Sequence, residues 1–245
     1  MHTLFSMNSR LIVALLLGLG FFCQFATLSL AADQNGSSKT VVVGTKKISL
    51  TLPLGYCFVD GARPVDVHFT NTTRGMFAGL NLHLLDILVD CGELAKWRER
   101  KIPDLDNLGQ YITPVAMLGK DLPITRAQFS SSICAKMRRQ AKQKMVKTMT
   151  DAMKKAEKFF EGVKASGQKF LGVLHEDIDA CYAGMLSTLK TQAGALKKVV
   201  GVFSMTLVKG KMVQLNLYTR YKGEASINRL LDIQKKNIKA LLAKP

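Results

Sequence analysis

Residues 199–221 read VVGVFSMTLVKGKMVQLNLYTRY, and this stretch decides the fold class. Two apolar runs, 199–208 and 212–221, are separated by the short glycine-containing connector Lys209-Gly-Lys211, a spacing that is typical of a β-hairpin. Alternate residues of a strand point to opposite faces of its sheet. One side of the second run thus collects Val213, Leu215, Leu217 and Thr219. The stretch therefore predicts a pair of antiparallel strands within a sheet.

The segment after this hairpin predicts a terminal helix. Residues 225–242 place a set of apolar side chains on one helical face, namely Ile227, Leu230, Leu231, Ile238, Leu241 and Leu242. A helix with a single apolar face buries that face against a core. We therefore expect this helix to pack on the sheet.

Short apolar runs upstream predict further strands. A first hairpin is expected from 40–43 and 48–52, on either side of Gly44-Thr-Lys-Lys47. The other expected strands cover 82–89, a region near 111–118, 170–174 and 183–186, and a helix is expected within 71–79.

The segment from Thr125 to about Ser166 has a different character, with no proline and a single glycine, Gly162. Apolar residues recur there every three or four positions: Phe129, Ile133, Met137, Ala141, Met145, Met149, Met153, Ala156, Phe160 and Val163. This period predicts one long amphipathic helix, with room for one break. The predicted fold is therefore α+β, an antiparallel sheet flanked by helices in one domain over 40–245, with a long basic amphipathic helical insertion near 125–166.

The N-terminal region has the pattern of a secretory signal peptide over residues 1–31. One basic residue, Arg10, precedes the apolar run 11–22, and Ser29-Leu-Ala31 fits the small-x-small pattern of a cleavage site. We expect cleavage after Ala31, or after Ala32, with a polar linker over 32–39. The chain would then be exported to the periplasm or secreted. An uncleaved anchor is the alternative, because about twenty apolar residues can span a bilayer.

Four cysteines follow the leader, Cys57, Cys91, Cys134 and Cys181. An even count in an oxidising compartment favours disulfides, and four cysteines allow three pairings. The pairing that we prefer joins Cys57 to Cys91, because both flank short predicted strands in one region. Free buried thiols that behave as small apolar side chains are the alternative.

The excess of basic over acidic residues lies almost entirely in the second half of the chain. Residues 32–134 carry eleven basic and ten acidic side chains, whereas residues 135–245 carry twenty-three and eight. The residues of the predicted helix that we expect to bind an anionic surface are Arg138, Arg139, Lys142, Lys144, Lys147, Lys154, Lys155 and Lys158, with Lys136 and Lys164 nearby. A basic amphipathic helix is typical of contact with an acidic membrane or an acidic protein partner. A face that is merely solvated is the alternative, and the exported location argues against nucleic acid.

The search for chemistry finds no complete catalytic or metal-binding motif. His175-Glu176 begins like a zinc-binding helix, but the second ligand position holds Asp179. Glu176, Asp177 and Asp179 would suit a hard cation, although a solvated turn explains them more simply. We therefore expect no catalytic residues, no metal and no cofactor, and the alternative is an enzyme whose site is assembled from scattered residues.

Several segments resemble a known family. They are Leu52-Pro-Leu-Gly-Tyr-Cys57, Gly79-Leu-Asn-Leu-His-Leu-Leu85 with Asp90-Cys91, and Gly201-Val-Phe-Ser-Met-Thr206 followed by Gly210-Lys211 and Leu217-Tyr218. Together with the terminal helix they resemble a family of uncharacterised exported bacterial proteins and, more distantly, the PsbP and DcrB type of α/β/α sandwich. The resemblance covers about half of the chain after the leader, and the long basic helix departs from it. It implies a non-enzymatic accessory or binding role in the bacterial envelope and supplies no catalytic residues.

Overall fold

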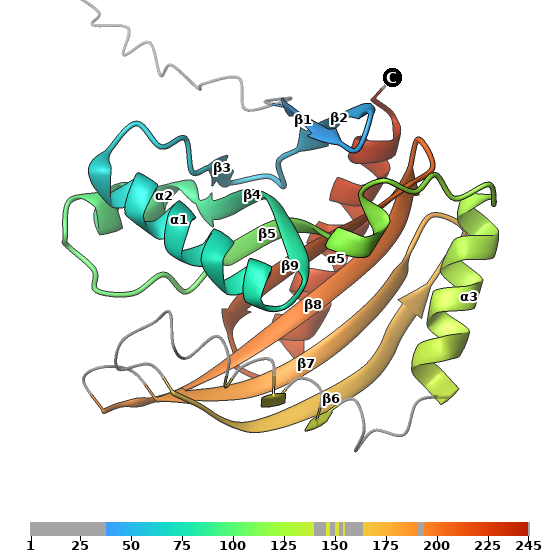
Figure 1. Ribbon diagram of the computed structural model, residues 1–245. Coiled ribbons are helices and arrows are strands. Elements are labelled where there is room, and N and C mark those ends of the chain that lie inside the picture. Colours follow the sequence, from blue (N-terminus) through green and yellow to red (C-terminus); the bar gives the residue numbers. More distant parts are fainter. Residues whose placement is uncertain are drawn as a thin grey trace, which may run out of the picture. The chain divides into compact units, whose positions relative to one another are not determined.

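The computed structural model describes residues 38–139, 164–190 and 194–244, together with 146, 147, 150, 151 and 154. These residues belong to one compact unit with an α+β fold (Figure 1). None of the helices within these ranges is both long enough and apolar enough to cross a membrane.

A seven-stranded sheet forms the centre of this unit, and all of its paired strands are antiparallel. In spatial order the strands are β3 (Tyr56–Phe58), β4 (Leu82–Asp90), β5 (Leu108–Pro114), β9 (Lys211–Arg220), β8 (Leu196–Val208), β7 (Cys181–Lys190) and β6 (Lys164–Glu176). The predicted hairpin is confirmed as β8 and β9, which pair from Val199 opposite Arg220 to Val208 opposite Lys211.

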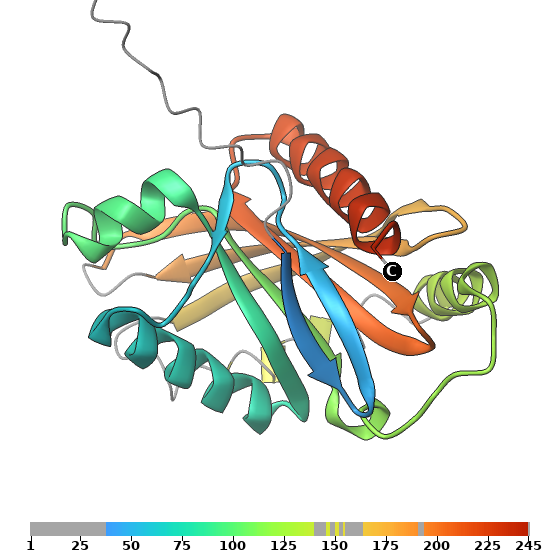
Figure 2. The ribbon, with the colours of Figure 1, turned by 90° about the horizontal axis from the view of Figure 1, so that it is seen from above.

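Helices cover both faces of the sheet. On one face, which we call the α5 face, lie α5 (Glu224–Leu242) and a separate hairpin of β1 (Ser38–Val43) and β2 (Lys46–Thr51) (Figure 2). On the opposite face lie α1 (Pro64–Gly79) over β4 and α3 (Arg126–Arg139) over β8. The short helix α2 (Cys91–Arg98) follows β4, and the 3-10 helix η1 (Val115–Met117) follows β5.

Buried polar contacts fix α5 on the sheet. The hydroxyl of Tyr111 donates to the carbonyl oxygen of Thr51 across 2.9 Å and accepts from the side chain of Asn237. One turn earlier on α5, Gln234 Nε2 donates to the carbonyl oxygens of Val202 and Leu215. Because buried polar groups cost free energy unless they are paired, these contacts specify the position of the helix as well as its burial.

The predicted helical insertion is wrong at its C-terminal end. Residues 164–166 belong to β6, and Gly167 and Gly172 have φ values of +62° and +96°, which do not fit a helix. At its N-terminal end the expected helix is present as α3, and the backbone at 146, 147, 150, 151 and 154 is helical. The rest of 140–163 lies outside the described residues, as does the predicted leader.

Four other elements differ from the expectation. The strand β3 and the helix α2 were not expected, and α1 begins at Pro64 rather than within 71–79. The strand expected near 111–118 ends at Pro114, where η1 begins. Proline is favoured at the first position of a helix, because its missing N–H would be unpaired there in any case. Pro64 could therefore have predicted the start of α1 from the sequence.

Candidate functional site

The helix α3, which carries the first of the predicted docking residues, packs on the sheet through an apolar face. Phe129 is buried against Met205 and Leu207 of β8, and the half-buried side chains of Ile133 and Met137 extend the same cluster. These residues occupy every fourth position, so they form one stripe along the helix. The first part of the predicted apolar stripe therefore packs in the hydrophobic core.

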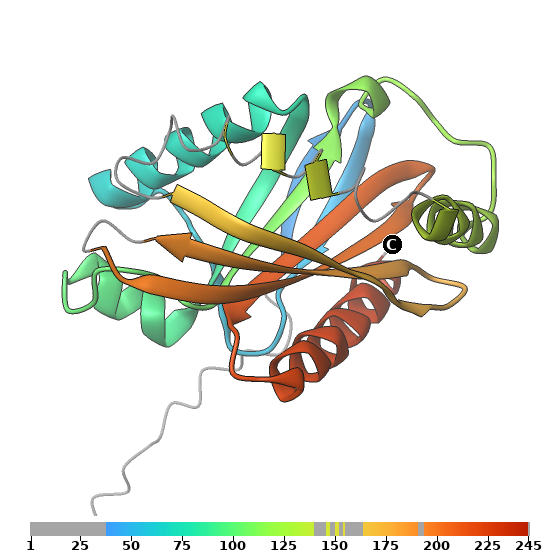
Figure 3. The ribbon, with the colours of Figure 1, turned by 90° about the horizontal axis from the view of Figure 1, so that it is seen from below.

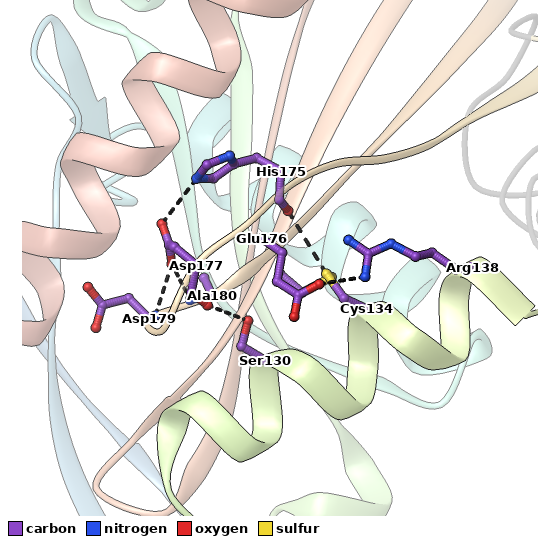
Figure 4. The surroundings of a disulfide bond; sticks show 9 residues. Ser130, Cys134, Arg138, His175, Glu176, Asp177, Asp179 and Ala180 are labelled. Carbon is purple, nitrogen blue, oxygen red and sulfur yellow. Dashed lines mark hydrogen bonds and ion pairs between the residues drawn. A yellow bond between two sulfur atoms is a disulfide. The ribbon is translucent and has the colours of Figure 1, made fainter.

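A second face of α3 is joined to the turn between β6 and β7. Four residues at four-residue spacing make this connection, and we call them the tether: Arg126, Ser130, Cys134 and Arg138. Cys134 forms a disulfide with Cys181, the first residue of β7. One turn earlier, the Ser130 hydroxyl donates to the carbonyl oxygen of Asp177 across 2.8 Å (Figure 4).

Ion pairs lie at both ends of the tether. Nη1 of Arg126 lies 2.8 Å from Oδ1 of Asp179, and Nη1 of Arg138 lies 2.6 Å from Oε2 of Glu176. Both pairs are partly exposed, so each contributes less than about 1 kcal/mol to the free energy of unfolding. Their main effect is to lower the local positive charge, because the carboxylates of Asp179 and Glu176 offset the charges of two arginines of the basic helix.

The acidic bend is a partly exposed turn, as expected, and its carboxylates have partners on α3 or within the bend. The carboxylate of Asp177 accepts from the backbone N–H groups of Asp179 and Ala180, at 2.9 and 2.8 Å, and lies 3.6 Å from Nε2 of His175 (Figure 4). It therefore stabilises its own turn, while the carboxylates on either side bind α3. Nowhere among the described residues do three His, Cys, Asp or Glu side chains gather as a metal site would require.

The remaining face of α3, which we call its free face, has no packing partner among the described residues. Lys136 and Arg139 are exposed, and no carboxylate within the described ranges pairs with either of them. Lys147 and Lys154 are also exposed. The other predicted docking residues, Lys142, Lys144, Lys155 and Lys158, lie outside the described residues. Arg138 is also exposed, but unlike Lys136 and Arg139 its guanidinium has a carboxylate partner, Glu176.

The cysteines form two disulfides. The preferred pairing of Cys57 with Cys91 is confirmed, with Cα atoms 5.1 Å apart, and it joins β3 to the first residue of α2. The second bridge, Cys134 to Cys181, spans 47 residues and belongs to the tether. The alternative of free buried thiols is wrong for all four.

Sequence reasoning missed the tether, although its signal was present. Arg126, Ser130, Cys134 and Arg138 share one helical face, and an acidic bend directly precedes Cys181. Given a disulfide between Cys134 and Cys181, the bend had to lie against that face.

An open cavity of about 240 Å³ lies beside β4, where a site assembled from scattered residues would be sought. Its lining includes Arg74 of α1, Asp86 of β4 and Lys39 of β1. Nζ of Lys39 lies 2.6 Å from Oδ2 of Asp86, and Oδ1 accepts from the N–H of Ile87 across 2.8 Å. Burial raises the pKa of Asp86, and the contact with Lys39 opposes that shift. Both carboxylate oxygens are engaged, so this pair anchors β1 on the sheet.

A second lining residue of this cavity, Asp60, also has a cationic partner. Nη2 of Arg98 lies 2.8 Å from Asp60 and 2.6 Å from Asp66, which is fully buried in α1. This arrangement connects α2 to α1. The carboxylates of the cavity are therefore structural ion-pair partners.

The comparisons with known proteins give remote structural similarity alone. No family model matches the chain, and no curated protein matches its sequence. Among solved structures, the chain is similar to the solution structure of cyanobacterial PsbP (CyanoP) from Synechocystis sp. PCC 6803, with 13% identity and a TM-score of 0.34 over 80% of this chain and 88% of that one. This similarity is too distant to place the chain in a family.

Proposed function

We propose that this chain is an exported, non-enzymatic binding protein that docks on an acidic membrane surface through the free face of α3 and the lysine-rich residues that follow. The supporting observation is that α3 is fixed on two faces, by Phe129 and its neighbours in the core and by the tether. The third face, with Lys136 and Arg139, is therefore held outward in a fixed position.

The charge of this region supplies the attraction. Residues 135–245 carry twenty-three basic and eight acidic side chains, and two of those acids, Glu176 and Asp179, are already used by the tether. Each lysine or arginine near an acidic bilayer contributes about 1 kcal/mol to binding. The proposed contact uses Lys136, Arg139, Lys147 and Lys154, together with the remaining sequence candidates Lys142, Lys144, Lys155 and Lys158.

Export is the second part of the proposal. It rests on the signal-peptide pattern of residues 1–31 and is compatible with two disulfides, which persist in oxidising compartments and are rare in reducing ones. We place the protein in the periplasm or outside the cell. N-terminal sequencing of the exported product should begin at Ala32 or Asp33.

Co-sedimentation with lipid vesicles tests the docking function. The protein should sediment with vesicles that contain phosphatidylglycerol but not with phosphatidylcholine alone, and binding should weaken as salt increases, because exposed charges are screened beyond about 8 Å at physiological ionic strength. Replacing Lys142, Lys144, Lys147, Lys154 and Lys155 by Gln should weaken binding without changing the circular dichroism spectrum. Equal sedimentation of the parent and this variant would overturn the proposal. Salt-sensitive capture by an acidic protein without any vesicle binding would replace the membrane by a protein partner.

A further inference from the structure

A second basic surface lies at the opposite end of the sheet from α3. Figure 3 shows α3 beside one end of β6 and β7. The last residue of β7, Lys190, and the first residue of β8, Leu196, lie at the other end of these strands. At that far end the register places Lys164 of β6 opposite Lys190 of β7, and Lys190 opposite Leu196 of β8.

Lys190, Leu196 and Lys198 share one face of the sheet. Directly opposed residues of antiparallel strands project on the same side, as do residues two apart on one strand. Lys190, Leu196 and Lys198 are related in this way, and Val200 and Val202, further along β8, belong to the same core cluster as Leu230 and Ile238 of α5. The set therefore lies on the α5 face.

Lys222 joins this set from the end of β9. The backbone N–H of Tyr221 donates to the carbonyl oxygen of Lys198 across 2.9 Å, so Tyr221 lies opposite Lys198 and Lys222 is the next residue at this end of the sheet. We call Lys190, Leu196, Lys198 and Lys222 the strand-end patch. All four side chains are exposed.

At this end of the sheet, the cations on one face have carboxylate partners and those of the strand-end patch do not. On the face opposite α5, Lys197 and Arg220 both pair with Asp106. Lys190 and Lys198 on the α5 face, and Lys222 at the same end of the sheet, have no ion-pair partner in the described part of the chain. The acidic residue closest in sequence is Glu224, which is itself exposed in the first turn of α5. The positive charge of the strand-end patch is thus largely uncompensated.

An apolar side chain stands in the middle of this charge. Leu196 is 71% exposed, which is comparable to Ile178 at 72%. Their surroundings differ, because Ile178 lies between Asp177 and Asp179 whereas Leu196 lies among lysines. Apolar side chains together with lysines are the combination that binds the interface of an acidic bilayer.

We propose that the strand-end patch is a separate membrane contact, in which Leu196 inserts into the interface of an acidic bilayer and Lys190, Lys198 and Lys222 bind the lipid headgroups. A partner that binds the lysines through charge alone would leave Leu196 in water, whereas the interface of an acidic bilayer binds both kinds of side chain. The proposal differs from the function proposed above in its location. Failure of one therefore does not imply failure of the other.

Vesicle binding of matched charge variants tests the site. At physiological salt, K190Q/K198Q/K222Q should bind equimolar phosphatidylcholine–phosphatidylglycerol vesicles on the order of 100-fold more weakly, since each lysine contributes about fivefold. The control K46Q/K47Q/K209Q removes three exposed lysines elsewhere and should lose less than about fivefold. L196N should weaken binding about tenfold and leave its salt dependence unchanged. Equal losses in the two triple variants would overturn the proposal.

Insertion itself is tested by fluorescence. The chain has one tryptophan, Trp97, so L196W adds a second emitter at the patch, to be compared with the parent. Brominated acidic lipids should quench the added emission. Emission that stays unquenched in bound protein would overturn the proposal. Loss of binding in K136Q/R139Q, with normal binding in the strand-end triple, would also overturn it and would support the α3 contact. The reverse result would support the strand-end patch alone.

Discussion

Cys134 of α3 and Cys181 at the start of β7 form a fully buried disulfide between residues 47 apart in sequence. In the chain-entropy model, a loop of this length makes the bridge contribute about 4 kcal/mol to the free energy of unfolding. The variant C134A/C181A should lose about that amount in urea unfolding without reductant. It should also show faster amide exchange in α3, because the bridge is the covalent part of the tether.

The second disulfide provides the control for this prediction. Cys57 and Cys91 close a loop of similar length, with a separation of 34 residues, so C57A/C91A should lose a similar free energy. Amide exchange in α3 should then stay at the parent rate below the unfolding transition. Acceleration of α3 exchange in both variants alike would contradict a local role for Cys134.

The buried lysine of the β8–β9 hairpin should be important for stability. Nζ of Lys211 donates to the carbonyl oxygens of Leu118 and Lys120, at 3.0 and 3.1 Å, and lies 2.8 Å from Asp121. K211M leaves two carbonyl groups without their donor and should lower the free energy of unfolding by about 2 kcal/mol.

K209M is the matched control for K211M. Lys209 is an exposed residue of the same turn, so its substitution should change the free energy of unfolding by less than about 0.5 kcal/mol. Urea midpoints measure both effects. Equal midpoints for K209M and K211M would show that the ammonium group of Lys211 does not hold the 118–121 segment.

Tyr111 should make the protein sensitive to alkaline pH. Burial raises the pKa of its hydroxyl to about 12. A folded-state pKa above the unfolded value means that the contribution of the neutral phenol is complete below pH 10 and is lost as the pH rises towards 12. Y111F should lower the free energy of unfolding by about 2 kcal/mol at neutral pH, because Asn237 and Thr51 lose their partner.

The same variant should lose less of its remaining stability between pH 10 and 12 than the parent does. Burial also raises the pKa of Tyr56 to about 12, so part of the alkaline loss should persist in Y111F. Denaturant unfolding at a series of pH values measures both slopes. Identical slopes in the parent and Y111F would contradict the role assigned to Tyr111.

The elements that the sequence predicts best are those whose side chains repeat with one period. The alternation of Val213, Leu215 and Leu217 predicts β9, and the apolar face that includes Ile238 predicts α5. The strand β6 escaped prediction over much of its length, because its pairing with β7 shifts register at three places and no simple alternation survives. The first residues of β6, 164–166, were predicted to be helical because the apolar residues before them recur with the period of a helix.

The short helix α2 was missed for a different reason. Asp90 accepts from the N–H of Glu93, which is an N-terminal capping contact with a recognisable spacing. This spacing was overlooked because the preceding apolar run 82–89 predicted a strand, and no helix was expected directly after it. The tether shows how much of the candidate site could not be predicted from the sequence. The sequence pattern identified the cations on α3. Only the structure shows that, of the adjacent residues Arg138 and Arg139, Arg138 is the one that pairs with Glu176.

Vesicle binding of two charge-matched double variants tests the central claim most directly. K136Q/R139Q removes two cations from the free face of α3, whereas R126Q/R138Q removes the two that pair with Asp179 and Glu176. At physiological salt, the first variant should bind vesicles that contain phosphatidylglycerol more than about tenfold more weakly than the parent, and the second should lose less than about threefold. Equal losses, or a larger loss in R126Q/R138Q, would contradict docking through the free face of α3.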